Sequence, residues 1–135
     1  DRVPRDVVGC LGEGHEQRAV QCAVELVRRA KRLSVARRAA GEAWGLDLRA
    51  GVAGGPVVLG PLGNQLKLDF TAIGMPVNLA ARLQGASLPG QVTVERELAR
   101  AAGYAVDDVE ALSLKGVAQP TPVVRISADS EGEAQ

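Results

Sequence analysis

A strand followed at once by a short helix is the feature that most constrains the fold of this chain. From Leu66 to Ile73 apolar and polar residues largely alternate, which predicts a half-buried strand. Gly74 ends that strand, and Pro76 suits the first turn of a helix, because its missing N–H would have no partner there anyway. The sequence therefore predicts a helix over about Pro76 to Gln84, with Gly85 closing it.

Two polar side chains share one face of this predicted helix. Asn78 and Arg82 are four residues apart, so they are neighbours on the helix surface. Leu79 and Leu83 have the same spacing and form an apolar stripe that can seat the helix on a sheet. Polar pairs at this spacing are common on solvated helix faces, so the pair indicates a ligand site only as part of a wider pattern.

That wider pattern is a resemblance to a known family. Residues 71–83, TAIGMPVNLAARL, resemble the signature T-V-I-G-D-A-V-N-L-A-A-R-L of the class III nucleotide cyclase catalytic domain. LDLRAGVAGGPVVLGPLG at 46–63 resembles the family's strand and glycine hairpin, SLKGVAQPTPVVRI at 113–126 its closing segment, and GEGHEQRAVQCAVELV at 12–27 the helix before them. The resemblance implies an α+β fold: a ferredoxin-like sandwich that dimerises head to tail and binds nucleotide between the protomers.

Four residues of this chain fall on functional positions of the family. The resemblance implies that Asn78 orients the ribose and that Arg82 stabilises charge developing on the α-phosphate, so both are catalytic candidates. Thr71 and Lys115 are substrate-binding candidates, at the position that helps select the base and the position that holds the distal phosphates. Spacing preserved across separate segments favours these roles over a chance match.

The first twelve residues depart from the family's hairpin, which reads roughly K-F-I-G-D-A-V-M-A-L-F-G. Aligned without gaps, Asp1 stands at the base-selecting lysine, Pro4 at the turn glycine and Arg5 at the second metal-binding aspartate. Asp6 comes one position late and points to the other face of a strand, so it is a weak candidate ligand. The family implies Mg²⁺ or Mn²⁺ as cofactor, but this chain offers no metal site of its own, and we predict that it is inactive alone.

The family's opening strand, which carries the first metal-binding aspartate, has no counterpart in this chain. In the ferredoxin-like order that strand lies between two strands that the chain retains, so we expect a slot with unpaired backbone groups on both sides. An upstream segment of a longer protein, or a strand from a partner, would fill it. The expected organisation is a cyclase homology domain over residues 1–127 and a disordered acidic tail over 128–135.

Composition sets the broad class. Sixteen Lys and Arg balance sixteen Asp and Glu, so no net charge draws the chain to nucleic acid. No apolar run approaches the roughly 20 residues of a membrane helix. Cys10 and Cys22 lack metal or redox spacing, which favours reduced, buried thiols and a cytoplasmic setting. The expected partner is a second cyclase domain, in a homodimer or heterodimer.

The remaining segments are predicted to be scaffold. A helix is expected from about Glu13, with Leu26 and Leu33 in its apolar stripe and a break near Ser34. Later elements are expected as strands at 92–94, 104–109, 111–115 and 122–126 and a helix at 95–102 ending at Gly103.

Two function classes remain open. The first is a cyclase protomer that makes cyclic nucleotide only when a partner or upstream segment supplies the aspartates. The second is a pseudo-cyclase that acts as a regulatory or dimerisation module. Thr71 is compatible with ATP and GTP, with cAMP the favoured product. A diguanylate cyclase is disfavoured because Gly54 to Val58 lacks the acidic residues of that family's loop.

Overall fold

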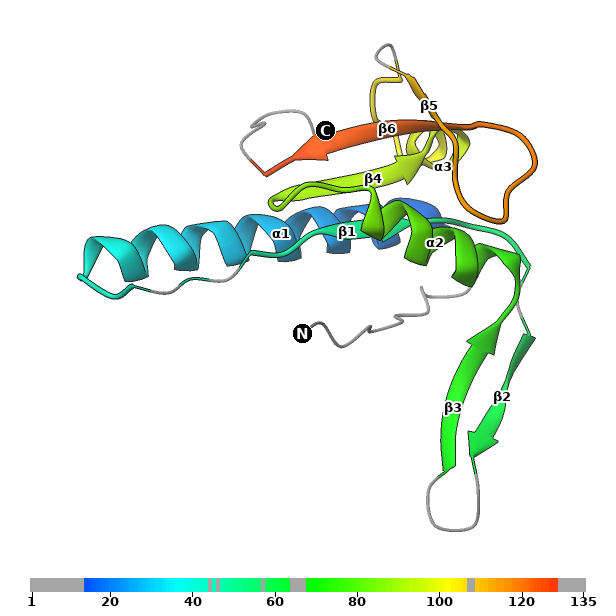
Figure 1. Ribbon diagram of the computed structural model, residues 1–135, viewed down its shortest axis with the longest axis horizontal. Coiled ribbons are helices and arrows are strands. Elements are labelled where there is room, and N and C mark those ends of the chain that lie inside the picture. The colour runs from blue at the N-terminus through cyan, green and yellow to red at the C-terminus, as the bar shows by residue number, and fades with distance from the viewer. Residues whose placement is uncertain are drawn as a thin grey trace.

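A mixed four-stranded sheet with helices on both faces, together with a separate two-stranded hairpin, makes up the fold (Figure 1). The computed structural model describes residues 14–43, 45, 47–56, 58–63, 68–106 and 109–128. The elements in chain order are α1 (His15–Ala39), β1 (Ala50–Val52), β2 (Val58–Gly63), β3 (Leu68–Ile73), α2 (Met75–Gly85), β4 (Gln91–Glu95), α3 (Arg96–Ala101), β5 (Glu110–Leu112) and β6 (Thr121–Ser127). The α+β class expected from the sequence is confirmed.

The four-stranded sheet has the order β1-β4-β6-β5. β1 runs parallel to β4, whereas β4 with β6 and β6 with β5 are antiparallel. Within the described part of the chain, β1 is an edge strand, paired on one side only. The slot expected for the opening strand would have this edge of β1 as one of its two sides. The other side falls in residues 1–13, outside the described residues.

One face of this sheet carries the main core. Ala50 and Val52 of β1 pack on the same side as alternate residues of β4 and β6, as the period of two requires. Helices α1 and α3 cover that side. The buried residues of the cluster are Val20, Val24, Val27, Val92, Val94, Leu98, Ala99, Ala102, Tyr104, Val124 and Ile126.

The opposite face of the sheet receives α2. Gly51, Thr93 and Arg125 lie directly beside one another in β1, β4 and β6, so they form one row across this face. Gly51 sits so close to α2 that an added Cβ would meet the backbone of Ala80 and Gln84, and Leu83 C at 2.8 Å. Only glycine fits here, and its missing side chain lets the helix backbone rest on the strand.

The hairpin β2–β3 projects away from the sheet and its helices (Figure 1). Its antiparallel register places Gly60 opposite Thr71. At the end of β3, Gly74 has φ 155°, a conformation that side chains rarely allow, and α2 begins at the next residue. The strand expected over 66–73 is confirmed for its described residues, Leu68–Ile73, and so are the glycine and the helix, although α2 continues through Gly85 to a cap at Ala86.

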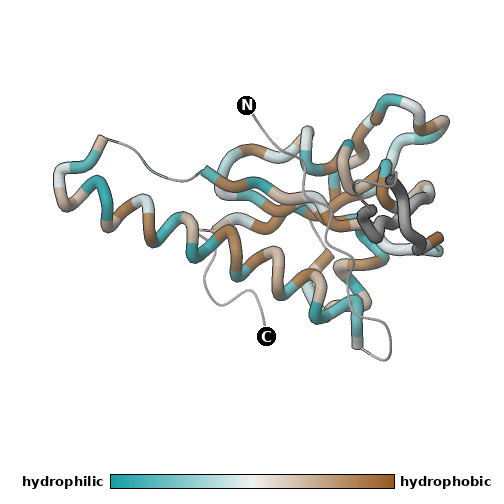
Figure 2. The backbone as a smooth tube through the Cα atoms, turned by 90° about the horizontal axis from the view of Figure 1, so that it is seen from below, coloured by the Kyte–Doolittle hydropathy of each residue, from teal (hydrophilic) through white to brown (hydrophobic). Residues whose placement is uncertain are grey.

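Helix α1 differs from expectation. It runs without a break through Ser34 to Ala39, since serine lowers helix propensity only slightly and alanine and arginine, which follow, favour a helix. Its later turns extend past the sheet (Figure 1), and many of their residues are hydrophilic (Figure 2). Leu26 and Leu33 are 53% and 39% exposed, so they lie outside the buried stripe. Cys22 is an exposed free thiol, which corrects the expectation that it is buried.

The strand expected at 104–109 is not formed by its described residues 104–106. Instead, α3 ends in a left-handed Gly103 with φ 89°, and Tyr104 N donates to Ala99 O at 3.0 Å. This Schellman arrangement ties Tyr104 back to the helix end rather than to a strand. Cys10 and most of the tail expected at 128–135 lie outside the described residues, and no helix within them is long and apolar enough to cross a membrane.

Candidate functional site

Helix α2 presents Asn78 and Arg82 to solvent. Both residues are exposed, while Leu83 is fully buried against the sheet. Neither polar side chain makes a hydrogen bond or ion pair with another described residue. The amide and the guanidinium are therefore available to an external ligand, on a helix that the sheet holds in place.

Lys115 lies in the loop between β5 and β6 and is also exposed. Val117 N donates to Leu114 O at 3.1 Å, and Gly116 has a left-handed φ of 82°, so a tight turn fixes the backbone around the lysine. The ammonium group makes no ion pair within the described part of the chain. A compact cation on a short turn suits a flexible, highly charged group such as a polyphosphate.

An open apolar cleft brings this loop to α2. The cleft has a volume of about 350 Å³ and is lined by Gly54, Gly55, Pro56, Met75, Pro76, Leu79 and Val117. Val117 follows Lys115 by two residues, and Leu79 follows Asn78 directly. The lysine loop and the N-terminal half of α2 therefore border the same cleft, although they are far apart in sequence; Asn78, Arg82 and Lys115 are not among the residues that line it.

Thr71, the fourth candidate, lies in β3 opposite Gly60. β3 is joined to α2 by Gly74 alone, so Thr71 lies in the strand that immediately precedes the helix. Arg5, which occupies the family's metal-ligand position, and Asp6, the weak candidate ligand, lie outside the described residues. Within the described ranges no three His, Cys, Asp or Glu side chains gather to hold a metal ion.

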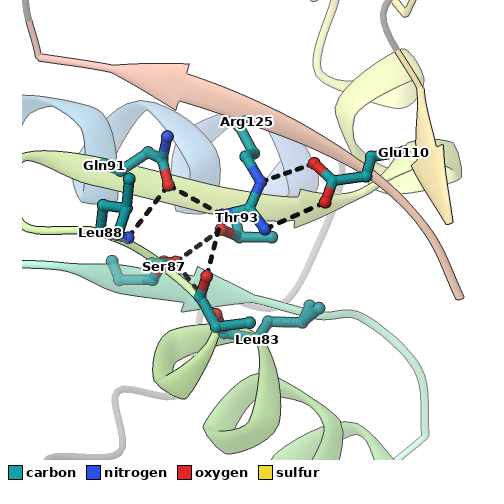
Figure 3. Close-up of polar contacts among 9 residues, drawn as sticks. Leu83, Ser87, Leu88, Gln91, Thr93, Glu110 and Arg125 are labelled. Atoms are coloured by element: carbon teal, nitrogen blue, oxygen red, sulfur yellow. Dashed lines mark hydrogen bonds and ion pairs between the residues drawn. The ribbon is translucent and has the colours of Figure 1, made fainter. Parts of the chain in front are cut away.

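The C-terminal end of α2 is held by a buried polar cluster that sequence reasoning missed (Figure 3). Ser87 Oγ lies 2.9 Å from Ala50 O, 3.0 Å from Leu83 O and 2.5 Å from Thr93 Oγ1. Ser87 and Thr93 are 1% and 0% exposed. A serine after a helix and a threonine in a valine-rich strand are ordinary in sequence, so only the fold reveals that they meet.

Two guanidinium groups donate hydrogen bonds to backbone carbonyl oxygens at this end of the helix. Arg125 donates to Ala86 O at 2.9 Å and to Glu110 Oε1 at 2.8 Å, and Arg49 donates to Ser87 O at 3.1 Å. Cations suit this position, because a helix carries partial negative charge at its C-terminus. The hydrogen bond from Arg125 lowers the pKa of the Glu110 carboxyl below its usual value.

Solved structures with a similar fold are nucleotide cyclases. The adenylyl cyclase CyaB from P. aeruginosa aligns with a TM-score of 0.73 at 26% identity, over 92% of this chain and 64% of that one. The guanylyl cyclase Cya2 aligns with a TM-score of 0.68 at 24% identity, over 83% of this chain and 57% of that one. The guanylate cyclase domain of RhGC from Catenaria anguillulae, solved in complex with GTP, aligns with a TM-score of 0.64 at 20% identity, over 87% of this chain and 62% of that one. The chain thus spans less than two thirds of each.

Sequence comparison points the same way. Comparison with curated proteins gives no significant match. The family model described as the adenylate and guanylate cyclase catalytic domain matches residues 7–125, which is most of the chain. The chain therefore belongs to the adenylate and guanylate cyclase catalytic domain family.

Proposed function

We propose that this chain supplies the residues that bind the ribose and phosphates and stabilise the transition state in a class III nucleotide cyclase site. It makes cyclic nucleotide from a nucleoside triphosphate when a partner domain or an upstream segment supplies the metal-binding aspartates. The observation that carries the proposal is the exposure of Asn78 and Arg82, which make no hydrogen bond or ion pair with another described residue, on a helix whose N-terminal half lines the same cleft as the loop of Lys115. In the proposed dimer, homotypic or with another cyclase domain, the second chain completes the cleft.

The roles follow from the charge that each group can meet. In cyclisation the ribose 3′-hydroxyl oxygen bonds to the α-phosphorus while the bond to the pyrophosphate leaving group breaks. Negative charge grows on the α-phosphate oxygens, where the Arg82 guanidinium stabilises it. Asn78 orients the ribose. Lys115 binds distal phosphates that are charged before the reaction begins, so it contributes to ground-state binding as well.

Adenine is the proposed base and cAMP the proposed product. In the family, Thr or Ser at the position of Thr71 marks one subclass of adenylate cyclases, and this supports ATP as the substrate. The free thiol of Cys22 is compatible with a reducing, cytoplasmic setting.

A second candidate is a pseudo-cyclase that keeps the fold and dimerises without turnover. The observation in its favour is the sequence at the N-terminus, where Arg5 replaces a metal-binding aspartate and Asp1 replaces the base-selecting lysine. A cation at a cation site opposes metal binding by charge repulsion. This candidate predicts heterodimers that bind nucleotide but form no cyclic product.

Complementation separates the two candidates. The helper is a cyclase domain that keeps both metal-binding aspartates but has its own Asn and Arg replaced by Ala, so it is inactive alone. Mixed with this chain, ATP and Mn²⁺, it should recover cAMP formation, because each cleft of a head-to-tail dimer draws its two sides from different chains. If heterodimers form, bind ATP and yield no cyclic product identified by mass, the enzyme proposal fails and the pseudo-cyclase stands.

A further inference from the structure

The buried hydroxyl pair Ser87 and Thr93 joins three elements at one point. Ser87 Oγ contacts Ala50 O of β1, Leu83 O of α2 and Thr93 Oγ1 of β4. A serine hydroxyl has one proton to donate and can accept from another donor. When Thr93 donates to Ser87, the single Ser87 proton is shared between the carbonyl oxygens of Ala50 and Leu83 in a three-centre bond. Thr93 then orients the Ser87 hydroxyl toward those two carbonyls.

The position of this pair links it to the candidate catalytic side chains. Leu83 follows Arg82 directly, so the residue that carries the guanidinium is next to the anchored carbonyl. Asn78 lies about one turn further from the anchor. Thr93 belongs to the row with Gly51, on which the helix backbone rests. The height and rotation of α2 above the sheet are therefore set where Ser87 and Thr93 meet.

Among the described residues, no side-chain hydrogen bond holds the opposite end of α2, where Val77 N and Asn78 N donate to Gly74 O. Met75 is 64% exposed, and its neighbours around the cleft are apolar. Apolar contacts are non-directional, so they resist rotation of a helix less than hydrogen bonds of fixed geometry do. Among the described residues, the side-chain hydrogen bonds that tie α2 to the sheet therefore gather at its C-terminal end.

We propose that Ser87 and Thr93 are positioning residues for nucleotide cyclisation, acting through α2 to hold Arg82, and with it Asn78, in register with the nucleotide. This inference rests on the proposed function. Displacement of a catalytic group by about 1 Å can cost a hundredfold in rate, so small movements of α2 should be visible in turnover.

The test uses the heterodimer of this chain with the aspartate-bearing helper. Thr93→Val removes the hydroxyl but keeps the shape, Thr93→Ser keeps the hydroxyl, and Ser87→Ala removes the centre of the pair. Thr121→Val serves as a matched control, because Thr121 is also buried but lies in β6, opposite Leu112. Each variant is measured for cAMP formation at saturating ATP, for ATP binding and for hydrogen exchange of the α2 amides.

We expect Ser87→Ala and Thr93→Val to lower the saturated rate roughly tenfold or more, with ATP binding changed less than about threefold. Exchange at residues 75–85 should accelerate in both variants. Thr93→Ser and Thr121→Val should retain the wild-type rate.

Three results would overturn the inference, and they are distinguishable. If the wild-type chain does not complement the helper, the proposed function fails and the positioning role fails with it. If the wild-type chain complements but Thr93→Val is as active as Thr93→Ser, only the positioning role fails. If Ser87→Ala does not fold while Thr93→Val folds and loses rate only in proportion to ATP binding, the pair is structural and positions nothing.

Discussion

The two ends of α2 are held in opposite ways. At the C-terminal end, Ser87, Arg125 and Arg49 donate hydrogen bonds to the carbonyl oxygens of Leu83, Ala86 and Ser87 respectively, and Leu83 is fully buried. At the N-terminal end, Met75 is largely exposed and the helix borders an open apolar cleft. Hydrogen bonds fix direction and distance, whereas the burial of apolar surface is favourable in any orientation. In the proposed arrangement, the C-terminal end sets the geometry of the polar face, and the N-terminal end offers apolar surface to a partner.

The largest effect should follow from Arg82→Ala, on the anchored half of the helix. In the complemented heterodimer we expect the rate of cAMP formation to fall by about 10² to 10³, the range seen when one charge-stabilising donor is removed. ATP binding should fall much less, because the charge on the α-phosphate grows during reaction. Lys115→Ala is the comparison variant and should weaken ATP binding as well. Equal losses of rate and binding for Arg82→Ala would contradict the assigned role.

Gly51→Ala should disrupt the anchored end by steric contact. The new Cβ would meet backbone atoms of α2, including Leu83 C at 2.8 Å, and backbone cannot rotate away as a side chain can. We expect the free energy of unfolding to fall by roughly 2–3 kcal/mol. Gly85→Ala is the matched control, with nothing within 4 Å of its Cβ, and should raise stability by about 0.5–1 kcal/mol. Urea denaturation of both variants measures this, and equal stabilities would mean that α2 does not rest on β1.

A substitution at the N-terminal end of α2 should change self-association more than it changes the free energy of unfolding. Met75→Ser changes an exposed residue, so the free energy of unfolding should move by no more than about 0.5 kcal/mol. If this face meets a second cyclase domain, self-association should weaken by roughly 1 kcal/mol, about fivefold in the dissociation constant. Sedimentation of wild type and Met75→Ser at matched concentrations gives the ratio. A wild-type chain that stays monomeric at high micromolar concentration would remove the proposed interface.

The smallest effect concerns Glu95, which accepts a hydrogen bond from Gly54 N at 3.2 Å beside the cleft. Burial raises the pKa of Glu95 above its usual 4.5, and the bond from Gly54 opposes this in part. Because the folded pKa is the higher one, the folded state binds more protons, and stability falls as pH rises from 4.5 through the folded pKa. Glu95→Gln keeps an acceptor but no charge.

We therefore expect Glu95→Gln to stabilise by a few tenths of a kcal/mol at pH 7, a typical size for partly exposed sites. The difference from wild type should shrink as pH falls below 4.5, because Glu95 then becomes mostly protonated in the unfolded state as well as in the folded one. Melting temperatures across this pH range test it, and a variant less stable than wild type at pH 7 would mean that the ionised carboxylate favours the folded loop.

Local patterns predicted the elements that carry the candidate site. The alternation before Gly74, the proline at the start of α2 and the Asn78–Arg82 spacing are properties of neighbouring residues, and α2 formed where they indicated. The break expected near Ser34 was wrong, because one serine does not outweigh the helix formers after it. The strand expected from Tyr104 was wrong because a left-handed glycine turns the chain back onto α3.

The sequence by itself determined the family, the α+β class and the polar face of α2, since these depend on short-range periodicity and on motifs that are contiguous in the chain. Only the tertiary structure decided which residues hold that face in place. Gly51, Thr93 and Arg125 lie far apart in sequence and become one row through strand register. Ser87 then meets that row because α2 ends directly above it. Register and crossing position are long-range outcomes of packing, and no local pattern records them.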